Sequence, residues 1–246
     1  MKAMIFAAGL GTRLRPLTND RPKALVEVNG KTMLERVITH VAEAGFDEIT
    51  INIHHFGQKI IDFLAEKKNF GLNLHISDER DLLLDTGGGL LKARKFLDGD
   101  EPFLVHNADI LTDLNLKAMH GYAAASGTLS TVLVKSRKTQ RYFLFDNTNQ
   151  LRGWVNKNTG ETKPAGTSYL PGQYRELAFG GIHIISPAIF DLLASYANGN
   201  AVFSITPFYI DTCARYPIHG YESQASYKWL DVGKPETLAQ AAAMFP

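Results

Sequence analysis

The sequence predicts an α/β fold of three layers, in which helices cover both faces of a mixed, mostly parallel central sheet. Three observations predict it. Short apolar runs alternate with amphipathic stretches through residues 1–128, a glycine-rich loop directly follows the first apolar run, and residues 129–246 alternate less regularly. No repeat, linker or low-complexity tract divides the chain. We therefore expect a single domain over residues 1–246, made of these two halves.

The elements of the first half follow from their periodicity. Apolar or alternating runs bounded by turn residues predict strands, and apolar residues at helical spacing predict helices. The expected strands are Lys2–Phe6, 49–53, 72–76 and 102–106, and the expected helices are 33–41, 60–64 and 87–97. Strands that alternate with helices of this length imply parallel βαβ units, which place ligands at the carboxyl ends of the strands.

The second half is predicted in the same way. Strands are expected at 129–134, 142–145 and 177–185, with a short one leading to Asp231, and helices are expected from Pro187, over 205–215 and over 234–244. Residues 158–176 are polar and rich in Gly, Pro and Thr, which is typical of a long loop or hairpin. A segment of that length indicates either a lid that closes over a pocket or a surface hairpin used for dimer contact.

The composition narrows the range of partners. Lys and Arg number 26 against 25 Asp and Glu, a net charge of +1, so neither nucleic acid nor an anionic membrane is expected as a partner. Cys213 is the single cysteine, which excludes an intrachain disulfide. The opening apolar run is too short for a signal peptide, and no stretch approaches the roughly twenty apolar residues of a membrane span. A cytoplasmic location is expected, as a monomer or homodimer.

The loop after the first strand has glycines at positions 9 and 11. Such glycines let backbone N–H groups approach a phosphate. A dinucleotide-binding turn would pass at once into a helix with a third small residue. Leu14 occupies that third position, and Pro16 and Pro22 would break the helix, so a nicotinamide dehydrogenase is disfavoured. The lysine pattern of a P-loop is also absent from this segment.

The candidate phosphate-binding side chains on this loop are Arg13, Arg15 and Lys23. Guanidinium and ammonium groups are the side chains that hold clustered phosphates, so the loop is expected to bind a polyphosphate. For Arg15 a role as a solvated loop charge is an equal alternative.

Two aspartates are expected at the ends of strands, Asp109 after 103–107 and Asp231 after Trp229 and Leu230. Either residue alone is more often a cap or turn residue. Together, at the carboxyl ends of strands, they can converge on one Mg²⁺, which is usually held by one or two carboxylates plus phosphates.

The segment Gly-x-Gly-Thr-Arg-Leu-x-Pro-Leu-Thr-x-x-x-Pro-Lys, residues 9–23, resembles the signature of the sugar nucleotidyltransferase family. That family includes thymidylyl-, uridylyl- and guanylyltransferases acting on hexose 1-phosphates, and the resemblance covers nearly the whole chain. It implies a Rossmann-like fold of the nucleotide-diphospho-sugar transferase type. It also implies that Arg13 grips the triphosphate and that Lys23 holds the reacting phosphates, so both are expected to be catalytic.

The same resemblance assigns the metal. Asn107-Ala108-Asp109 is similar to the family's first metal motif, with Ala108 in place of the usual glycine, and residues 229–233 are similar to its second, Trp-x-Asp-x-Gly. Asp109 and Asp231 are therefore the expected Mg²⁺ ligands.

The resemblance also implies which residues bind the two substrates. Nucleotide contacts are expected from Ala8, Gly9, Gly11, Thr12, Arg13, Thr86, Gly87, Gly88 and Asn107, in the half 1–128. Sugar contacts are expected from Lys157 and Gly181, in the half 129–246. The basic run Lys135, Arg137 and Lys138 could contact the sugar phosphate in the same way as Lys157, but a solvated turn is expected.

Residues 85–89, Asp-Thr-Gly-Gly-Gly, resemble a short single-domain branch of the family, the N-acetylmuramate 1-phosphate uridylyltransferases. The expected reaction joins UTP to N-acetylmuramate 1-phosphate, or to a related amino sugar 1-phosphate, and releases pyrophosphate. A guanylyltransferase that uses GTP with mannose or heptose 1-phosphate is the near alternative. A catalytically silent, regulatory sugar-nucleotide-binding homologue is the alternative of another class.

Overall fold

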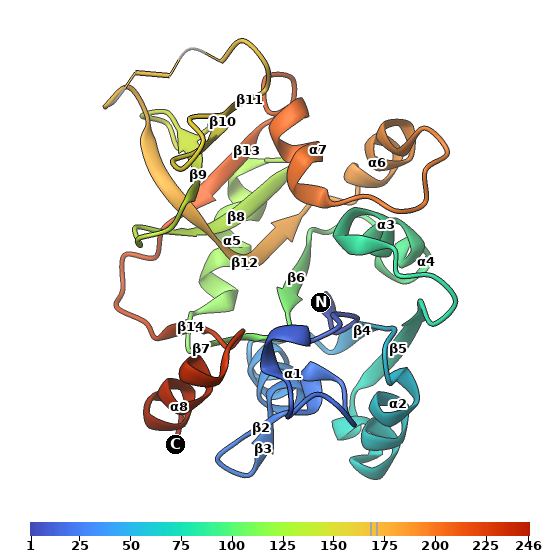
Figure 1. Cartoon of the computed structure of the whole chain (residues 1–246). Helices are drawn as coiled ribbons and strands as arrows, with labels where there is room; N and C mark the ends of the chain where they lie inside the picture. The colour runs from blue at the N-terminus through green and yellow to red at the C-terminus, as the bar shows by residue number, and fades with distance from the viewer. Residues whose placement is uncertain (168, 171) are drawn as a thin grey trace.

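A continuous mixed sheet forms the middle of the molecule (Figure 1). The computed structural model describes residues 1–167, 169–170 and 172–246. The sheet order is β11-β10-β9-β12-β6-β1-β4-β5, with β8 beside β12 and β13 beside β8. The first-half strands are β1 (Lys2–Phe6), β4 (Glu48–Ile53), β5 (Asn73–Asp78) and β6 (Phe103–Asn107), and they pair in parallel. The predicted fold class is confirmed.

The second-half strands join this sheet mainly in antiparallel pairs. They are β8 (Ser130–Lys135), β9 (Arg141–Phe145), β10 (Leu151–Asn156), β11 (Thr162–Lys163), β12 (Arg175–Ile185) and β13 (Ile218–Tyr221). The long strand β12 pairs with β6 through its second part and with β9 through its first, so it connects the two halves. Two short ribbons lie outside the sheet, β2 (Glu27–Val28) with β3 (Lys31–Thr32), and β7 (Ile110–Thr112) with β14 (Trp229–Asp231).

Helices pack on both faces of the sheet because its central strands are apolar on both sides (Figure 1). One face is covered by α1 (Met33–Glu43), α2 (Gly57–Glu66), α5 (Leu116–Ser126) and α8 (Pro235–Met244). The other is covered by α3 (Asp85–Lys92), α4 (Arg94–Leu97), α6 (Ile189–Ala197) and α7 (Ile205–Thr212). Within the part of the chain that is described, no helix is long and apolar enough to cross a membrane.

Several boundaries differ from the sequence prediction. The helix expected over 87–97 starts at Asp85 and is interrupted at Ala93, where α4 begins. The helix expected from Pro187 begins two residues later, at Ile189. Short 3₁₀ turns, η1 (Thr12–Leu14), η2 (Lys23–Leu25) and η3 (Lys68–Gly71), complete the elements. The segment 158–176 is partly a hairpin, since β11 pairs with β10; Ser168 and Pro171 lie outside the described residues.

Candidate active site

A cavity of about 400 Å³ opens where β1 and β6 end. This is the carboxyl edge of the parallel strands, where a fold of this class binds ligands. Six of the residues predicted to bind substrates or metal line this cavity: Ala8, Gly9, Lys23, Thr86, Asn107 and Asp109. Gly11, Thr12, Arg13, Gly87 and Gly88, which were also expected to bind nucleotide, do not line it.

The glycine loop uses its two glycines differently. At Gly9 an added Cβ would meet no protein atom within 4 Å, so the backbone there faces open space in the cavity. Gly11 has φ +65°, and a Cβ there would lie 3.0 Å from the Cβ of Lys23 and 3.1 Å from Cγ2 of Thr18. Thr18 also donates its hydroxyl to the Gly11 carbonyl at 2.8 Å. The loop therefore folds back on itself, and this close packing positions Lys23 beside the cavity.

Lys23 forms an ion pair with Asp109, the residue between β6 and β7. The ribbon of β7 and β14 then brings in the second aspartate, because Asp231 pairs with Ile110 and the Val232 amide donates to the Asp109 carbonyl at 2.8 Å. Two carboxylates more than a hundred residues apart in the sequence are thus held at neighbouring backbone positions. The predicted convergence of Asp109 and Asp231 occurs in the structure.

The Asp231 carboxylate is largely removed from water. Burial raises its pKa, the charge of Asp109 raises it further, and the charges of Lys23, Arg13 and Arg137 lower it. Its Oδ1 is buried and has no hydrogen-bond partner among the described residues. A buried carboxylate oxygen without a partner is costly unless a ligand satisfies it.

Arg13 reaches this carboxylate from the opposite end of the chain. A Cβ added to Gly233 would lie 2.9 Å from Asp231 Oδ1 and 3.0 Å from Arg13 Nη2. The glycine therefore leaves room for the guanidinium beside the carboxylate, and Arg13, although outside the lining of the cavity, belongs to its charged rim.

The donor set fits a hard cation that shares its ligands with phosphates. Asp109 and Asp231 supply carboxylate oxygens, and Asp231 Oδ1 lacks a partner among the described residues. No group of three or more His, Cys, Asp or Glu side chains with metal-binding geometry occurs in the described ranges. Two carboxylates suit Mg²⁺, which usually keeps phosphate and water ligands.

The floor of the cavity contains a polar chain that sequence reasoning missed. Asn52 Oδ1 accepts from the Ala7 amide at 2.7 Å, and its Nδ2 donates to Glu79 Oε1 at 2.7 Å. The Leu84 amide donates to Glu79 Oε2 at 3.1 Å. Glu79 is fully buried, and burial raises its pKa. One signal was available, because Asn52 is an amide residue near the carboxyl end of an expected parallel strand, where this fold class binds ligands.

The three glycines of α3 are explained by packing. A Cβ on Gly87 would overlap the ring of Phe203, one on Gly88 would overlap the Ala201 carbonyl, and one on Gly89 would lie 2.7 Å from Glu79 Oε1. The Gly87 and Gly88 amides both donate to the Phe203 carbonyl, at 2.9 and 3.1 Å. The amides of Gly87 and Gly88, two residues expected to contact the nucleotide, are therefore already used within the protein.

The polar groups of Thr86 are also used in hydrogen bonds within the protein. Its amide donates to Asp85 Oδ1 at 2.6 Å, and its hydroxyl accepts from the Ile205 amide at 3.0 Å, which satisfies the first turn of α7. Asp85 has φ +60°, in the left-handed region that few residues other than glycine tolerate, and it lines the cavity. A ligand can meet the exposed side chain of Asp85 more readily than the backbone of Thr86.

On the sugar side, the structure places Gly181 at the site. Its φ is +74°, and a Cβ there would lie 2.8 Å from Cγ1 of Ile110 and 3.0 Å from Nδ2 of Asn107. The register of β12 is irregular between Phe179 and His183. This irregularity brings bare backbone against Asn107, at the edge of the cavity.

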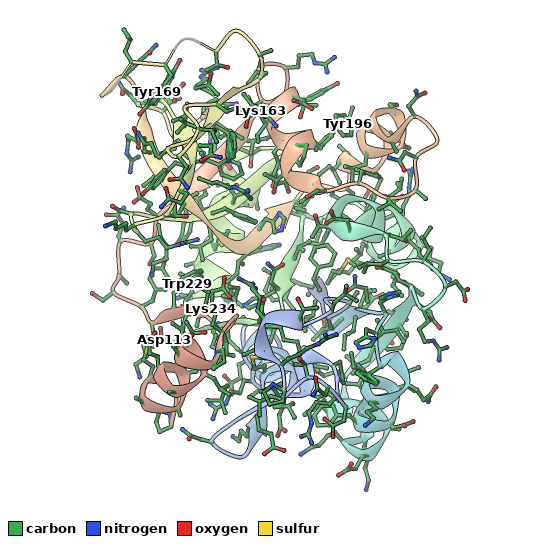
Figure 2. The ribbon with its side chains drawn as sticks, in the orientation of Figure 1. Asp113, Lys163, Tyr169, Tyr196, Trp229 and Lys234 are labelled. Atoms are coloured by element: carbon green, nitrogen blue, oxygen red, sulfur yellow. The ribbon has the colours of Figure 1, made fainter. Side chains whose placement is uncertain are left out.

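Lys157 is not brought to the same place. Its Nζ pairs with Glu176 Oε1 at 2.7 Å and also contacts the Tyr169 hydroxyl. Figure 2 shows Tyr169 on the hairpin, far from Trp229 of the β7–β14 ribbon. Lys157 is thus held against the hairpin by Glu176 and Tyr169, and its expected contact with the sugar stays a prediction.

Instead, two residues of the run expected to be a solvated turn lie near the aspartates. Lys135 and Arg137 both lie over the ring of Trp229, two residues before Asp231. Lys135 is the last residue of β8 and not part of a turn, whereas Arg137 is exposed between β8 and β9, as a solvated turn predicts. Their position could not be read from the sequence, because it depends on β8 and β14 meeting in space.

The comparisons agree with this geometry. The sequence matches the family described as nucleotidyl transferase over residues 2–245. An N-acetylmuramate alpha-1-phosphate uridylyltransferase of Neisseria meningitidis serogroup B is 32% identical over 99% of this chain and 98% of its own length. One of Caulobacter vibrioides is 32% identical over 98% and 95%.

The fold is shared with solved structures as well. A putative glucose-1-phosphate thymidylyltransferase from Bacillus anthracis superposes with a TM-score of 0.80 at 19% identity, covering 99% of this chain and 94% of that one. At that identity the likeness concerns the fold alone, whereas the family match extends over nearly every residue of the sequence. The chain belongs to the nucleotidyl transferase family.

Proposed function

We propose that this protein is a sugar-1-phosphate nucleotidyltransferase that joins UTP to an N-acetylated amino sugar 1-phosphate, with N-acetylmuramate 1-phosphate as the first candidate. The observation that carries the proposal is the meeting of Lys23, Asp109 and Asp231 at the edge of the cavity. The two relatives that are 32% identical over nearly their whole length are named for this reaction, which supports the choice of substrates.

The reaction follows from the charges of the site. An oxygen of the sugar 1-phosphate attacks the α-phosphorus of the nucleotide in line, the bond to the β-phosphate breaks, and pyrophosphate leaves. No protein nucleophile is required, so catalysis consists of positioning and charge neutralisation. Lys23 and Arg13 supply positive charge at the phosphates. The open backbone at Gly9 leaves room for them beside the loop.

Asp109 and Asp231 are proposed to hold Mg²⁺. When bound there, the ion would neutralise negative charge on the phosphates of both substrates. The partnerless, buried Oδ1 of Asp231 supports this assignment. It also counts against a silent regulatory homologue, which has no need of a costly buried carboxylate beside a lysine and an arginine.

The buried carboxylate of Glu79 is the proposed contact for the base. It already accepts from Asn52 and from the Leu84 amide, and its remaining lone pairs can accept an N–H of a base. Uracil offers one such donor and guanine offers more, so the site suits both. GTP with mannose or heptose 1-phosphate therefore stays the near alternative, and the two relatives favour UTP.

A panel of nucleoside triphosphates and sugar 1-phosphates, assayed for pyrophosphate release with Mg²⁺, tests the proposal. We expect release with UTP and N-acetylmuramate 1-phosphate or a related amino sugar 1-phosphate. The Asp231→Asn variant should lose about a hundredfold or more in kcat, comparable to removing one strong transition-state contact. Release only with GTP and mannose or heptose 1-phosphate would establish the alternative. No release with any pair, together with binding of sugar nucleotides, would establish a regulatory homologue.

A further inference from the structure

Two cations lie over one aromatic surface next to the catalytic aspartates. Lys135, the last residue of β8, has its Nζ 4.2 Å from the ring centroid of Tyr227 and 5.4 Å from that of Trp229. The guanidinium carbon of Arg137 is 5.2 Å from the Trp229 centroid. Both positive charges are therefore held at a single indole ring.

The indole ring itself is fixed. Trp229 Nε1 donates to the Gly180 carbonyl at 2.9 Å, and Arg137 Nη2 donates to the adjacent Phe179 carbonyl at 3.3 Å. These bonds tie β14 to the irregular part of β12, whose next residue, Gly181, lies against the Asn107 side chain. Figure 2 shows Trp229 in the region between the ribbon carrying β14 and the second-half strands. The two cations are thus connected, through residues 179–181 of β12, to Asn107 at the edge of the cavity.

Spacing along β14 connects this cluster to the aspartate. Residues two apart on a strand point to the same face, so Trp229 and Asp231 share one side of β14. The ring of Trp229, over which the Arg137 guanidinium lies, is therefore on the same side of β14 as the Asp231 carboxylate. A group held beside Arg137 is consequently also close to the carboxylate proposed to serve the transferred phosphate.

Neither cation is neutralised by the protein. Among the described residues, no carboxylate lies within ion-pair distance of Lys135 or Arg137. Other cations of the second-half strands do have such a partner, as Arg152, Lys157 and Arg175 show. Burial lowers the pKa of Lys135, and the charge of Arg137 lowers it further, which shows that the two charges repel. Two adjacent like charges without a counter-ion are unfavourable unless an anion joins them.

The rival position is already neutralised. Lys157 pairs with Glu176 at 2.7 Å and contacts Tyr169 on the hairpin. An incoming phosphate would have to displace that carboxylate. Lys138, in the same basic run, is exposed as Arg137 is, but its ammonium group lies over no aromatic ring among the described residues. Among the described residues of this basic run, only Lys135 and Arg137 lie over Trp229, two residues before Asp231.

We propose that Arg137 and Lys135 bind the phosphate of the sugar 1-phosphate, held over Trp229 so that the attacking oxygen points toward Asp109 and Asp231. This inference rests on the proposed function and assigns its acceptor site. Arg137 contributes a planar fork that matches phosphate oxygens, and Lys135 contributes a second charge. The Phe179 and Gly180 carbonyls keep the arginine and the indole in place before the substrate arrives.

Steady-state kinetics of four single variants test the assignment: Arg137→Gln, Lys135→Gln, Lys138→Gln and Lys157→Gln. We expect Arg137→Gln to raise the KM for the sugar 1-phosphate about tenfold or more, as expected for one lost charged hydrogen bond. The KM for UTP should change less than about twofold. Lys135→Gln should show a smaller effect of the same kind, and Arg137→Lys should restore part of it. Lys138→Gln and Lys157→Gln should match the wild type.

A binding measurement separates this inference from the proposed function. N-acetylglucosamine 1-phosphate is titrated by calorimetry into protein saturated with a non-hydrolysable UTP analogue and Mg²⁺. Heat from the wild type and Lys138→Gln, but not from Arg137→Gln at the same concentration, supports the site even if no pair in the panel releases pyrophosphate. Equal affinity of wild type and Arg137→Gln would overturn it. So would an increased KM in Lys157→Gln with none in Arg137→Gln. Equal thermal unfolding midpoints of the variants exclude a merely structural role.

Discussion

Lys23 lines the cavity and also reaches Asp109. Gly11, with φ +65°, allows the loop to close over the Cβ of Lys23, and the ion pair with Asp109 then fixes the ammonium group. A residue placed this way contributes little to holding the base. Its charge acts instead where the bond between the α- and β-phosphates breaks, since negative charge develops there.

Replacing Lys23 by alanine should therefore affect turnover more than nucleotide affinity. We expect kcat to fall about a hundredfold or more, comparable to the loss of one preorganised donor, while the KM for the nucleotide changes only a few-fold. Arg13→Ala should impair both constants. The matched control is Arg21→Ala, since Arg21 is exposed on the same loop and pairs with its neighbour Asp20 at 3.1 Å. An increased KM with unchanged kcat in Lys23→Ala would mean that the lysine provides uniform binding only.

For single residues, sequence motifs could predict a functional role only where the residues that mark the role are close together in the sequence. Asp109 and Asp231 each lie in a short pattern that marks the end of a strand, and the structure brings them together. Glu79 and Arg137 lie in no such pattern. Their positions depend on contacts with Asn52 on another strand and with Trp229 on another element, so only the folded chain shows them.

Among the secondary-structure elements, α3 shows that a sequence required for close packing can resemble a ligand-binding motif. A run of three glycines after Asp85 resembles a loop that lies against a ligand. In the structure the glycines let α3 approach the segment before α7, where the Phe203 carbonyl accepts from two α3 amides. The sequence alone is compatible with ligand binding and with helix packing. The structure favours packing, because the segment around Ala201 lies against the glycines.

Alanine substitutions in two helices test this interpretation. Gly88→Ala would place a methyl group inside van der Waals contact with the Ala201 carbonyl, so we expect a loss of about 2 kcal/mol or more in the free energy of unfolding. The control is Gly121→Ala in α5, where a Cβ meets no atom within 4 Å, and there we expect a gain of about 0.5–1 kcal/mol. Urea unfolding measures both. Stability gained in both variants, with nucleotide affinity lost only in Gly88→Ala, would restore the ligand interpretation.

Other elements escaped sequence reasoning because their patterns are weak. Helix α5 contains four alanines and a glycine and shows no clear apolar stripe, although Asn115 caps it by accepting from the Ala118 amide at 2.9 Å. Strand β13 has only four residues. In the hairpin of residues 158–176, turn-forming residues are common, yet Thr162 and Lys163 still pair with β10. These elements form because of their tertiary contacts, since the helix or strand propensity of their residues is close to neutral.

At the scale of the whole molecule, the β6–β12 pair that joins the halves contains two buried histidines. His106 on β6 and His183 on β12 are each 1% exposed, and the Nε2 atoms of both lack a hydrogen-bond partner among the described residues. His183 Nδ1 is 2.8 Å from the Tyr209 hydroxyl. Burial lowers the pKa of His106 to about 4 and that of His183 to about 3, and the neighbouring histidine lowers the latter further. Protonation of either ring therefore destabilises the junction of the halves.

The sign of the pH dependence follows from these pKa values. Unfolded histidine titrates near 6.5, so between that pH and the folded pKa the unfolded chain binds more protons than the native one. The stability contributed by neutral His106 and His183 is thus complete above about pH 6.5 and declines as the pH falls. His40 and His219, whose pKa values burial also lowers, act in the same direction. Glu79, whose pKa burial raises, acts in the opposite direction.

Urea unfolding at pH 7 and pH 5 should therefore show a marked loss of stability on acidification, to which His183 alone contributes about 2 kcal/mol. His183→Gln removes that titration, so we expect the difference in unfolding free energy between the two pH values to shrink by about that amount, whatever the stability of the variant at pH 7. Most carboxylates titrate below this window, which leaves the histidines as its main contributors. If His183→Gln and the wild type lose equal stability between pH 7 and pH 5, the protonation of His183 does not limit the junction of the two halves.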